Sequence, residues 1–270
     1  MTILHMAGFL ASIFIGISLG LIGGGGSILT LPVLVYLLGI NPVLSVTYSM
    51  FIVGTTSLVG SVNYMRQQQV NYKTALFFAL PSFLTIYLTR TFIVPAIPDP
   101  VFTIDTFVLT KNVAVMVFFA LIMLAASMSM IRNNSPAVTT ETDEQRPFNW
   151  PVIVLDGALV GILTGIVGAG GGFLIIPALV LLARLPMKVA VGTSLLIIAA
   201  NSLIGFGNSF AVAVDWSFLL KFTALSVVGI FVGTYLTRFI PGQKLKKSFG
   251  WFVLIMGVYI ISRELFFNAG

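Results

Sequence analysis

Cysteine is absent from the 270 residues of this chain, and histidine occurs only once, at His5. The absence of cysteine excludes a disulfide framework and a thiolate metal site. Intramembrane proteases need paired histidines with an acid, two carboxylates, or a serine with a base. Apart from Glu264 near the end of the last apolar segment, the apolar segments contain one acid, Asp156, and the one histidine. We therefore expect no enzyme activity, no bound metal and no cofactor.

Charged residues are also scarce. They make up 8% of the chain, whereas 58% is hydrophobic, and soluble domains carry about 25% charged residues. Lipid must therefore solvate most of the outer surface. Several apolar runs are long enough, at about 1.5 Å per residue, to cross a hydrocarbon core of about 30 Å. We predict an all-α polytopic membrane protein whose long runs include 4–22, 43–65, 112–131 and 248–267.

The net charge of +6 does not indicate a nucleic-acid partner. Most of the fourteen Lys and Arg residues lie in short connections between apolar spans, where positive charge orients a protein in the membrane. Lys244, Lys246 and Lys247 are typical of this role, or of contact with anionic lipid head groups. The first apolar run lacks a basic flank and a small-residue cleavage pattern, so we expect a mature helix there.

The two halves of the chain repeat each other. A shift of 145 positions aligns residues 16–63 with 161–208, and 18 of the 48 aligned pairs are identical. Shared hydrophobicity alone would not match glycines. We predict two membrane repeats, 1–132 and 151–270, joined by a polar linker, 133–150. The identical pairs include Gly20, Gly23, Gly25, Gly26 and Pro32 with Gly165, Gly168, Gly170, Gly171 and Pro177, and at a shift of 148 Tyr87–Arg90 recurs as Tyr235–Arg238.

Each half contains five apolar segments, of which the second is short. Twelve helical residues span about 18 Å, a little over half of the hydrocarbon core. Each repeat is therefore predicted to hold four spanning helices and one short half-helix broken by glycine. The segments are 3–22, 28–39, 43–65, 72–94 and 112–131 in the first half, and 151–167, 173–184, 187–208, 217–238 and 248–267 in the second.

The short segments either complete a crossing or turn back to the face from which they started. If they cross, ten of the fourteen basic residues share one face, and if they turn back the split is 8 against 6. The positive-inside tendency favours crossing. Because five crossings per unit is an odd number, the second copy would be inverted relative to the first. Inverted repeats are typical of transporters.

A glycine run precedes each short segment, at Gly23–Ser27 and at Gly168–Gly172. Glycine lets the backbone leave the helical region, and the new helix presents unpaired N–H groups and a positive dipole end. These features favour anion binding, and inversion would bring the two helix starts together near the membrane midplane. The alternative is that the glycines only permit close helix packing. The predicted substrate-binding residues here are Gly24, Gly25, Gly26, Ser27, Gly170, Gly171 and Gly172.

The helix after each break carries a polar stripe. Hydroxyls and amides can donate to an anion without the cost of burying a full charge. The same residues could instead form hydrogen bonds between helices, and the sequence leaves both readings open. Thr193 and Ser194 are favoured because they lie one turn into a helix facing the proposed site. The candidate residues are Ser49, Thr56 and Asn63 in the first copy, and Thr193, Ser194, Asn201 and Asn208 in the second.

Charged residues near the helix ends form a third group. Arg90 and Arg238 end the two copies of the Tyr-Leu-Thr-Arg motif. Long cationic side chains at such positions anchor a helix at the interface, and gating or substrate attraction is the alternative. We expect Lys221 and Asp156 to lie at the interface as well, although Asp156 could titrate in a proton-coupled cycle.

The duplicated glycine run, a proline six to nine residues further on, and Gly192-Thr193-Ser194 in the following helix resemble the TauE/SafE sulfite exporter family, also described as the toluene sulfonate uptake permeases. The resemblance covers nearly the whole chain. The first copy departs from the pattern, with Thr47-Tyr48-Ser49 in place of Gly192-Thr193-Ser194. The resemblance implies transport of sulfite, sulfonates or related organosulfur anions across the cytoplasmic membrane of a prokaryote.

The sequence therefore predicts a secondary transporter that moves a small sulfur-containing anion by alternating access. An anion channel and a non-transporting membrane scaffold or assembly factor are the alternatives. The expected partners are the small anionic substrate and the lipid bilayer. Coupling to a proton or a sodium ion and the oligomeric state stay open.

Overall fold

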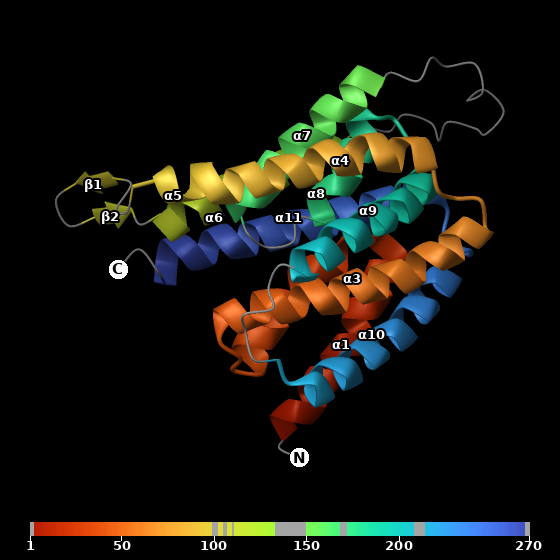
Figure 1. Cartoon of the computed structure of the whole chain (residues 1–270), viewed down its shortest axis with the longest axis horizontal. Coiled ribbons are helices and arrows are strands. Elements are labelled where there is room, and N and C mark those ends of the chain that lie inside the picture. The colour runs from red at the N-terminus through yellow and green to blue at the C-terminus, as the bar shows by residue number, and fades with distance from the viewer. Residues whose placement is uncertain are drawn as a thin grey trace.

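The computed structural model describes residues 3–98, 102–104, 107–109, 111–132, 150–167, 172–207 and 214–267. Nearly all of these residues are helical, and the helices form one bundle (Figure 1). Six of the described helices are long and apolar enough to cross a membrane, and shorter apolar helices lie between them. This confirms the predicted all-α polytopic membrane protein.

The first half begins with α1 (Ile3–Ile22), which leads into the short α2 (Gly25–Pro32) and a π-helical turn, η1 (Val33–Leu37). Two long helices follow, and after them come short elements and a hairpin that projects at one end of the bundle (Figure 1). The sequence did not predict this hairpin, in which Phe102 pairs with Leu109. The remaining elements are α3 (Pro42–Arg66), α4 (Tyr72–Leu88), η2 (Thr89–Ile93), α5 (Val94–Ala96), β1 (Phe102–Ile104), β2 (Phe107–Leu109) and α6 (Lys111–Arg132).

The second half repeats this order without the hairpin. Its last helix begins at Gly242, six residues before the predicted start, so the three lysines Lys244, Lys246 and Lys247 lie in the first turns of that helix. The predicted linker falls, except for Trp150, outside the described residues. The elements are α7 (Trp150–Val167), α8 (Gly172–Pro177), η4 (Ala178–Leu182), α9 (Met187–Gly207), α10 (Trp216–Thr237) and α11 (Gly242–Phe267).

The two short helices end in the same way. Pro32 and Pro177 lack the backbone N–H that continues an α-helical ladder, and a π-helical turn follows each of them. The N–H of Leu38 donates to the Val33 carbonyl at 3.1 Å, and the N–H of Ala183 donates to the Ala178 carbonyl at the same distance. These four residues correspond at the shift of 145, so the duplication extends to backbone detail.

The helices pack in pairs, and replacing each helix of a pair by its counterpart from the other copy gives another pair that is also in contact. α1 packs against α10, and its counterpart α7 packs against α4, the counterpart of α10. α3 packs against its own counterpart α9, and α6 packs against α11. This pattern is the one that a two-fold relationship between the copies produces.

Counterpart helices run in opposite directions where they touch. A Cβ atom placed at Gly54 of α3 would lie 3.0 Å from Leu203 Cγ of α9, and one placed at Gly192 of α9 would lie 2.9 Å from Tyr64 Cβ of α3. Residue numbers thus rise along α3 as they fall along α9. The antiparallel contact supports the predicted inversion of the second copy.

The relative directions of α1, α3 and α10 show how the first short helix runs. On α10, the backbone at Ile230 and Thr234 faces Gly20 of α1, and Thr234 also accepts a hydrogen bond from Asn63 of α3. Ile230 contacts Gly60, one turn earlier on α3. Both α1 and α3 therefore run parallel to α10 and end at the same face. The chain must return across the bundle between them, through α2 and η1, as the crossing arrangement requires.

Glycines permit these parallel contacts to be close. A Cβ atom at Gly20 would lie 2.7 Å from the Ile230 carbonyl oxygen, and one at Gly161 would lie 2.5 Å from the Ser82 carbonyl oxygen. No side chain can be accommodated at such distances without moving the neighbouring helix. Small residues at helix contacts are a common means of helix association in membranes. The glycines within α1 and α7 therefore permit close helix packing.

Candidate functional site

The first break begins where α1 stops at Ile22. Gly23 has φ +77, a left-handed conformation that glycine adopts without a steric penalty. Its N–H donates to the Leu19 carbonyl at 2.7 Å. Gly24 then turns the chain with φ −140 and ψ −15 and precedes the first residue of α2. The predicted glycine break is therefore present at these positions.

The end of α1 is held by two other helices. The last carbonyls of a helix lack intrahelical donors, and the Gly20 carbonyl accepts a hydrogen bond from the Tyr64 hydroxyl at 2.8 Å and another from the Thr237 hydroxyl at 3.2 Å. The sequence analysis did not single out these two side chains. The signal for Thr237 was available, because it belongs to the repeated Tyr-Leu-Thr-Arg motif.

The start of α2 is buried. Gly25, Gly26 and Ser27 are all inaccessible to solvent. The Ser27 hydroxyl donates to the Gly24 carbonyl at 2.7 Å, and the Thr30 hydroxyl donates to the Gly26 carbonyl at 2.7 Å. Both hydroxyl protons are therefore committed to the backbone, while the hydroxyl oxygens can still accept.

The first break meets the start of the second half-helix. A Cβ atom at Gly24 would lie 2.6 Å from the Gly172 carbonyl oxygen and 2.8 Å from Phe173 Cα, and one at Gly172 would lie 3.1 Å from Ser27 Oγ. Gly172 also faces Ile198, near the midpoint of α9. The helix starts thus lie against each other deep in the bundle. Gly170 and Gly171 lie outside the described residues.

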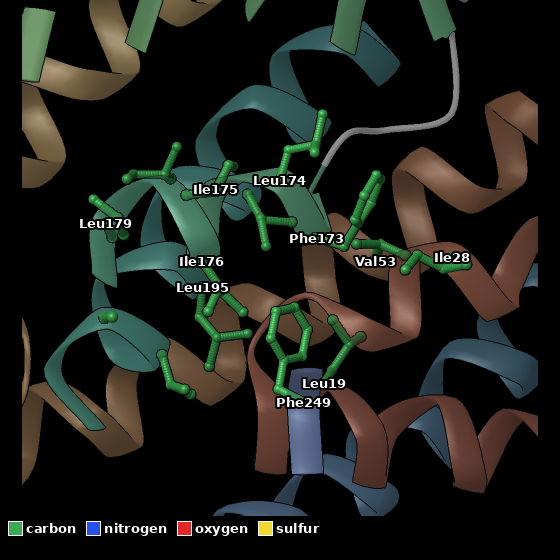
Figure 2. Close-up of a cluster of buried hydrophobic side chains, with 14 of the residues drawn as sticks. Leu19, Ile28, Val53, Phe173, Leu174, Ile175, Ile176, Leu179, Leu195 and Phe249 are labelled. Carbon is green, nitrogen blue, oxygen red and sulfur yellow. The ribbon is translucent and has the colours of Figure 1, made fainter. Parts of the chain in front are cut away.

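Buried apolar side chains form a cluster that includes the start of α8 (Figure 2). Phe173 belongs to α8 and Leu195 to α9, and Leu19 of α1 and Phe249 of α11 belong to the same cluster. Leu195 and Phe249 are fully buried. The sequence analysis predicted a polar site here, whereas the described surroundings are mainly apolar. This is a closed arrangement, in which the helix starts are withdrawn from solvent.

Two serine hydroxyls lie next to the first break. A Cβ atom at Gly25 would lie 2.5 Å from Ser18 Oγ, and one at Gly23 would lie 2.7 Å from Ser194 Oγ. Ser194 donates to the Val191 carbonyl at 2.8 Å. Ser18 Oγ is buried and has no hydrogen-bond partner among the described residues. The structure therefore brings Ser194 to the break as predicted, and adds Ser18, a polar residue in the last turns of α1 that the sequence analysis missed.

Two asparagines of the polar stripe bridge helices. The Asn63 amide donates to the Thr234 hydroxyl at 2.8 Å, and the Asn201 amide donates to the Ser82 hydroxyl at 3.3 Å. Both asparagines therefore form hydrogen bonds between helices, which was the alternative to anion binding. Thr56 is fully buried, and its hydroxyl has no hydrogen-bond partner within the described ranges. Ser49 is half-buried, and Asn208 lies outside the described residues.

Thr193 takes part in a contact that recurs in the other copy. Its hydroxyl accepts a hydrogen bond from the Asn71 N–H at 3.0 Å, and the Tyr48 hydroxyl accepts one from the Asp215 N–H at 2.8 Å. Tyr48 and Thr193 correspond at the shift of 145, and Asn71 and Asp215 are the N-caps of α4 and α10. Thr193, a favoured candidate for substrate contact, thus docks the start of a helix from the other copy.

Aromatic rings pack around the docking contact of Tyr48. Tyr48 stacks on Phe218 with ring centroids 5.9 Å apart. Next to it, Phe51 lies 5.0 Å from the Phe206 ring and 5.9 Å from that of Trp216. The ends of α3, α9 and α10 at this side are therefore closed by aromatic packing.

The charged candidates differ in exposure. Arg90 is half-buried in η2, whereas Arg238 is exposed at the end of α10. Lys221 is exposed, as expected for the interface. Asp156 does not match that expectation, because its side chain is only 6% exposed. It is the seventh residue of α7, and the packing of α7 against its neighbours covers it.

Comparisons with known proteins agree with this architecture. The family model described as "Sulfite exporter TauE/SafE" matches residues 8–260. A "Probable membrane transporter protein" of Xylella fastidiosa (strain 9a5c) is 30% identical over 254 residues, which cover 93% of this chain and 92% of the relative. The "Probable membrane transporter protein YunE" of Bacillus subtilis (strain 168) is 24% identical over 264 residues, which cover 91% and 93%. No solved structure matches the chain.

Proposed function

Because this chain belongs to the sulfite exporter TauE/SafE family and is a multi-pass transporter of a prokaryotic cytoplasmic membrane, we propose that it is a secondary carrier for a small sulfur-containing anion. Sulfite, thiosulfate and small sulfonates are the candidate substrates. Transport is by alternating access, in which the two copies move relative to each other around a central site.

The meeting of the two glycine breaks supports this proposal most strongly. Gly24 and Gly172 touch near the middle of the bundle, where two helices begin. Helix starts carry unpaired N–H groups and the positive end of the dipole, and the low dielectric of the membrane interior strengthens their attraction for an anion. An anion at this point would need no buried cationic side chain.

Hydroxyls would complete the site. Ser27, Ser194 and Thr56 are buried polar groups on the half-helix and on the two helices that follow the breaks, and Ser18 adds a hydroxyl next to Gly25. Ser49, the glycines of the second break and the asparagines of the stripe remain part of the proposed binding region. Arg90 and Arg238 remain anchoring or gating residues.

In the closed arrangement, the carrier would hold this site away from both faces. Separation of Phe173 and Leu195 from Leu19 and Phe249 would let water and the anion reach the helix starts. Each glycine run gives the backbone the freedom that such a movement requires. We expect one face to open at a time, because the two docking contacts close opposite ends of α3 and α9.

Counterflow in proteoliposomes tests the proposal. Protein-containing vesicles loaded with unlabelled sulfite, thiosulfate or methanesulfonate should take up the labelled anion faster than empty vesicles. Such trans-stimulation is expected of a carrier and not of a channel. A parallel thermal-shift screen with carboxylates included should show stabilisation by the transported anion, because a ligand that binds the native state raises its apparent stability. Stabilisation by carboxylates alone would contradict the assignment to sulfur anions.

Gly25→Leu is the informative variant, and Gly207→Leu is its control. A Cβ atom at Gly25 would lie 2.5 Å from Ser18 Oγ, whereas one at Gly207 meets nothing within 4 Å. We expect Gly25→Leu to insert into the membrane and lose transport, and the control to keep it. Full transport by Gly25→Leu would exclude the break as part of the site, and Gly171→Leu applies the same test to the second break.

A further inference from the structure

Among the side chains that the structure describes, Asp156 is the only acid within a membrane helix. It is 6% exposed, and its Oδ2 atom has no hydrogen-bond partner in the described part of the chain. Asp215 differs in both respects, because it is exposed and its side chain accepts the Phe218 N–H at the start of α10. Asp215 thus has a structural role as a helix cap, whereas no described contact gives Asp156 a structural role.

A buried carboxyl group without a partner is costly. An ionised carboxylate in an apolar interior loses its hydration, and no ion pair or hydrogen bond compensates Oδ2 of Asp156. Ionisable residues inside membrane helices are rare for this reason, and they mark ion and proton pathways. A carboxyl group that gains and loses a proton avoids a permanent buried charge.

The elements that pack against α7 are α4, η2, α6, α8 and η4. Gly157, next to Asp156, lies against Phe78 of α4. α4 and α7 run parallel. Counted along the helix axis from the level of Gly157 at about 1.5 Å per residue, Lys73 lies about 8 Å away in one direction and Arg90 about 18 Å away in the other. α8 and η4 carry no ionisable residue. The ionisable residues on the other elements are Lys73, Tyr72 and Tyr87 on α4, Arg90 on η2, and Lys111 and Arg132 on α6.

The position of Asp156 links it to the second break. α7 leads directly into that break, and it packs against both α8 and η4, which form the second half-helix. Asp156 is therefore part of the helix that packs against an element which the proposed carrier cycle must move. Lys73 and Arg132 are both exposed, and the half-buried Arg90 lies about 18 Å along the helix axis from the level of Gly157.

These observations rest on the carrier function proposed above, and from them we infer that Asp156 is the proton-binding site that couples anion transport to the proton gradient. Its carboxylate takes up one proton from water at one membrane face. It returns that proton to water at the other face after the second half-helix has moved. No other group changes its covalent state in this cycle.

The first test measures proton movement in proteoliposomes that contain the full chain and an entrapped pH-sensitive dye. Methanesulfonate and thiosulfate serve as probes, because both stay ionised near neutral pH and carry no exchangeable proton of their own. We expect a gradient of the transported probe to change the internal pH with wild-type protein and with Asp156→Glu. Asp156→Asn should lose the pH change and keep counterflow.

Asp215→Asn is the matched control. It removes one carboxylate, and asparagine caps a helix about as well as aspartate, so its pH change should equal that of the wild type. Anion-driven proton movement by Asp156→Asn at the wild-type level would overturn the inference. Loss of the pH change in both asparagine variants would overturn it as well, because the effect would then not be specific to Asp156.

Infrared spectroscopy of the purified protein provides a second readout that does not depend on transport. Because the chain has eight Asp and Glu residues, the readout is the difference between variants. One component of the carboxylic C=O stretching band that grows on acidification should be present in wild type and Asp215→Asn, missing in Asp156→Asn, and shifted in Asp156→Glu. A wild-type spectrum without such a band would exclude proton binding at Asp156. If wild type transports neither probe, the carrier proposal for these anions fails, whereas the infrared titration still decides whether Asp156 binds a proton.

Discussion

The end of α1 in the first copy is tied to its neighbours, because the Gly20 carbonyl accepts hydrogen bonds from Tyr64 and Thr237. At the end of α7 in the second copy, the equivalent neighbour is Thr89 of the first copy, the counterpart of Thr237, and its buried hydroxyl has no hydrogen-bond partner among the described residues. The arginine that follows each threonine also differs, since Arg90 is half-buried and Arg238 is exposed. The duplicated backbone thus carries different side-chain contacts at equivalent positions.

This difference indicates which parts of the duplication are fixed by packing. The paired helices, the glycine contacts and the π-helical turns recur in both copies, because each is a condition for closing the bundle. The hydrogen bond that Thr237 makes to the first break does not recur at Thr89 among the described residues. A transporter with two opposite faces has no need for equal stability at both breaks, and the less constrained side would move first. The following variants test this comparison.

The largest effect is expected from Gly20→Ala. The new Cβ atom would lie 2.7 Å from the Ile230 carbonyl oxygen and 2.8 Å from the Thr234 nitrogen, both of which are backbone atoms of α10. Overpacking costs about 1–3 kcal/mol, and we expect the upper end because a helix must move. At Gly165, the counterpart, the two nearest atoms belong to the Thr89 side chain. Melting curves in detergent should show a larger decrease for Gly20→Ala than for Gly165→Ala.

The two docking contacts give the next effect. Tyr48→Phe and Thr193→Val each remove the acceptor of an N-cap N–H group, that of Asp215 or of Asn71. A buried donor without a partner costs about 1–3 kcal/mol. We expect similar losses of thermal stability for the two variants, because the contacts are equivalent. A loss confined to one of them would show that the docking contacts have diverged as the breaks have.

Much of the fold could be predicted from the sequence, because long apolar runs and glycine breaks leave few alternatives. All ten apolar segments correspond to described helices, and α1 has the predicted bounds. The hairpin β1–β2 was not predicted, because two three-residue strands leave almost no periodic pattern. The α11 start was placed too late, because Lys244, Lys246 and Lys247 conceal the helix in a hydropathy pattern.

The candidate site was harder to predict. The glycine runs and Ser194 were found because they recur, and the structure brings both together. Thr193, Asn63 and Asn201 could not be assigned, because a polar side chain in a membrane helix can serve a ligand or a neighbouring helix equally well. Asp156 was expected at the interface, since sequence position alone does not show that neighbouring helices cover the first third of α7.

A smaller effect is expected from Thr237→Val in comparison with Thr89→Val. Thr237→Val removes the hydroxyl that donates to Gly20, and side-chain hydrogen bonds between membrane helices contribute about 0.6 kcal/mol on average. Thr89→Val removes a hydroxyl that has no partner among the described residues and preserves the shape that packs against Gly165. We expect the first variant to melt at a lower temperature and the second to match the wild type. Equal melting temperatures would remove the proposed difference between the breaks.

The smallest change in stability is expected at the polar stripe, where Thr56 and Asn201 are counterparts. Asn201 donates to Ser82, whereas the buried Thr56 hydroxyl has no described partner. Thr56→Val should therefore leave the melting temperature unchanged, since valine has nearly the same shape, and Asn201→Leu should lower it slightly. If the Thr56 hydroxyl serves the anion, Thr56→Val will nevertheless reduce counterflow. A variant that keeps both stability and counterflow would show that this hydroxyl belongs to neither the packing nor the site, and would limit the substrate-binding region to the breaks themselves.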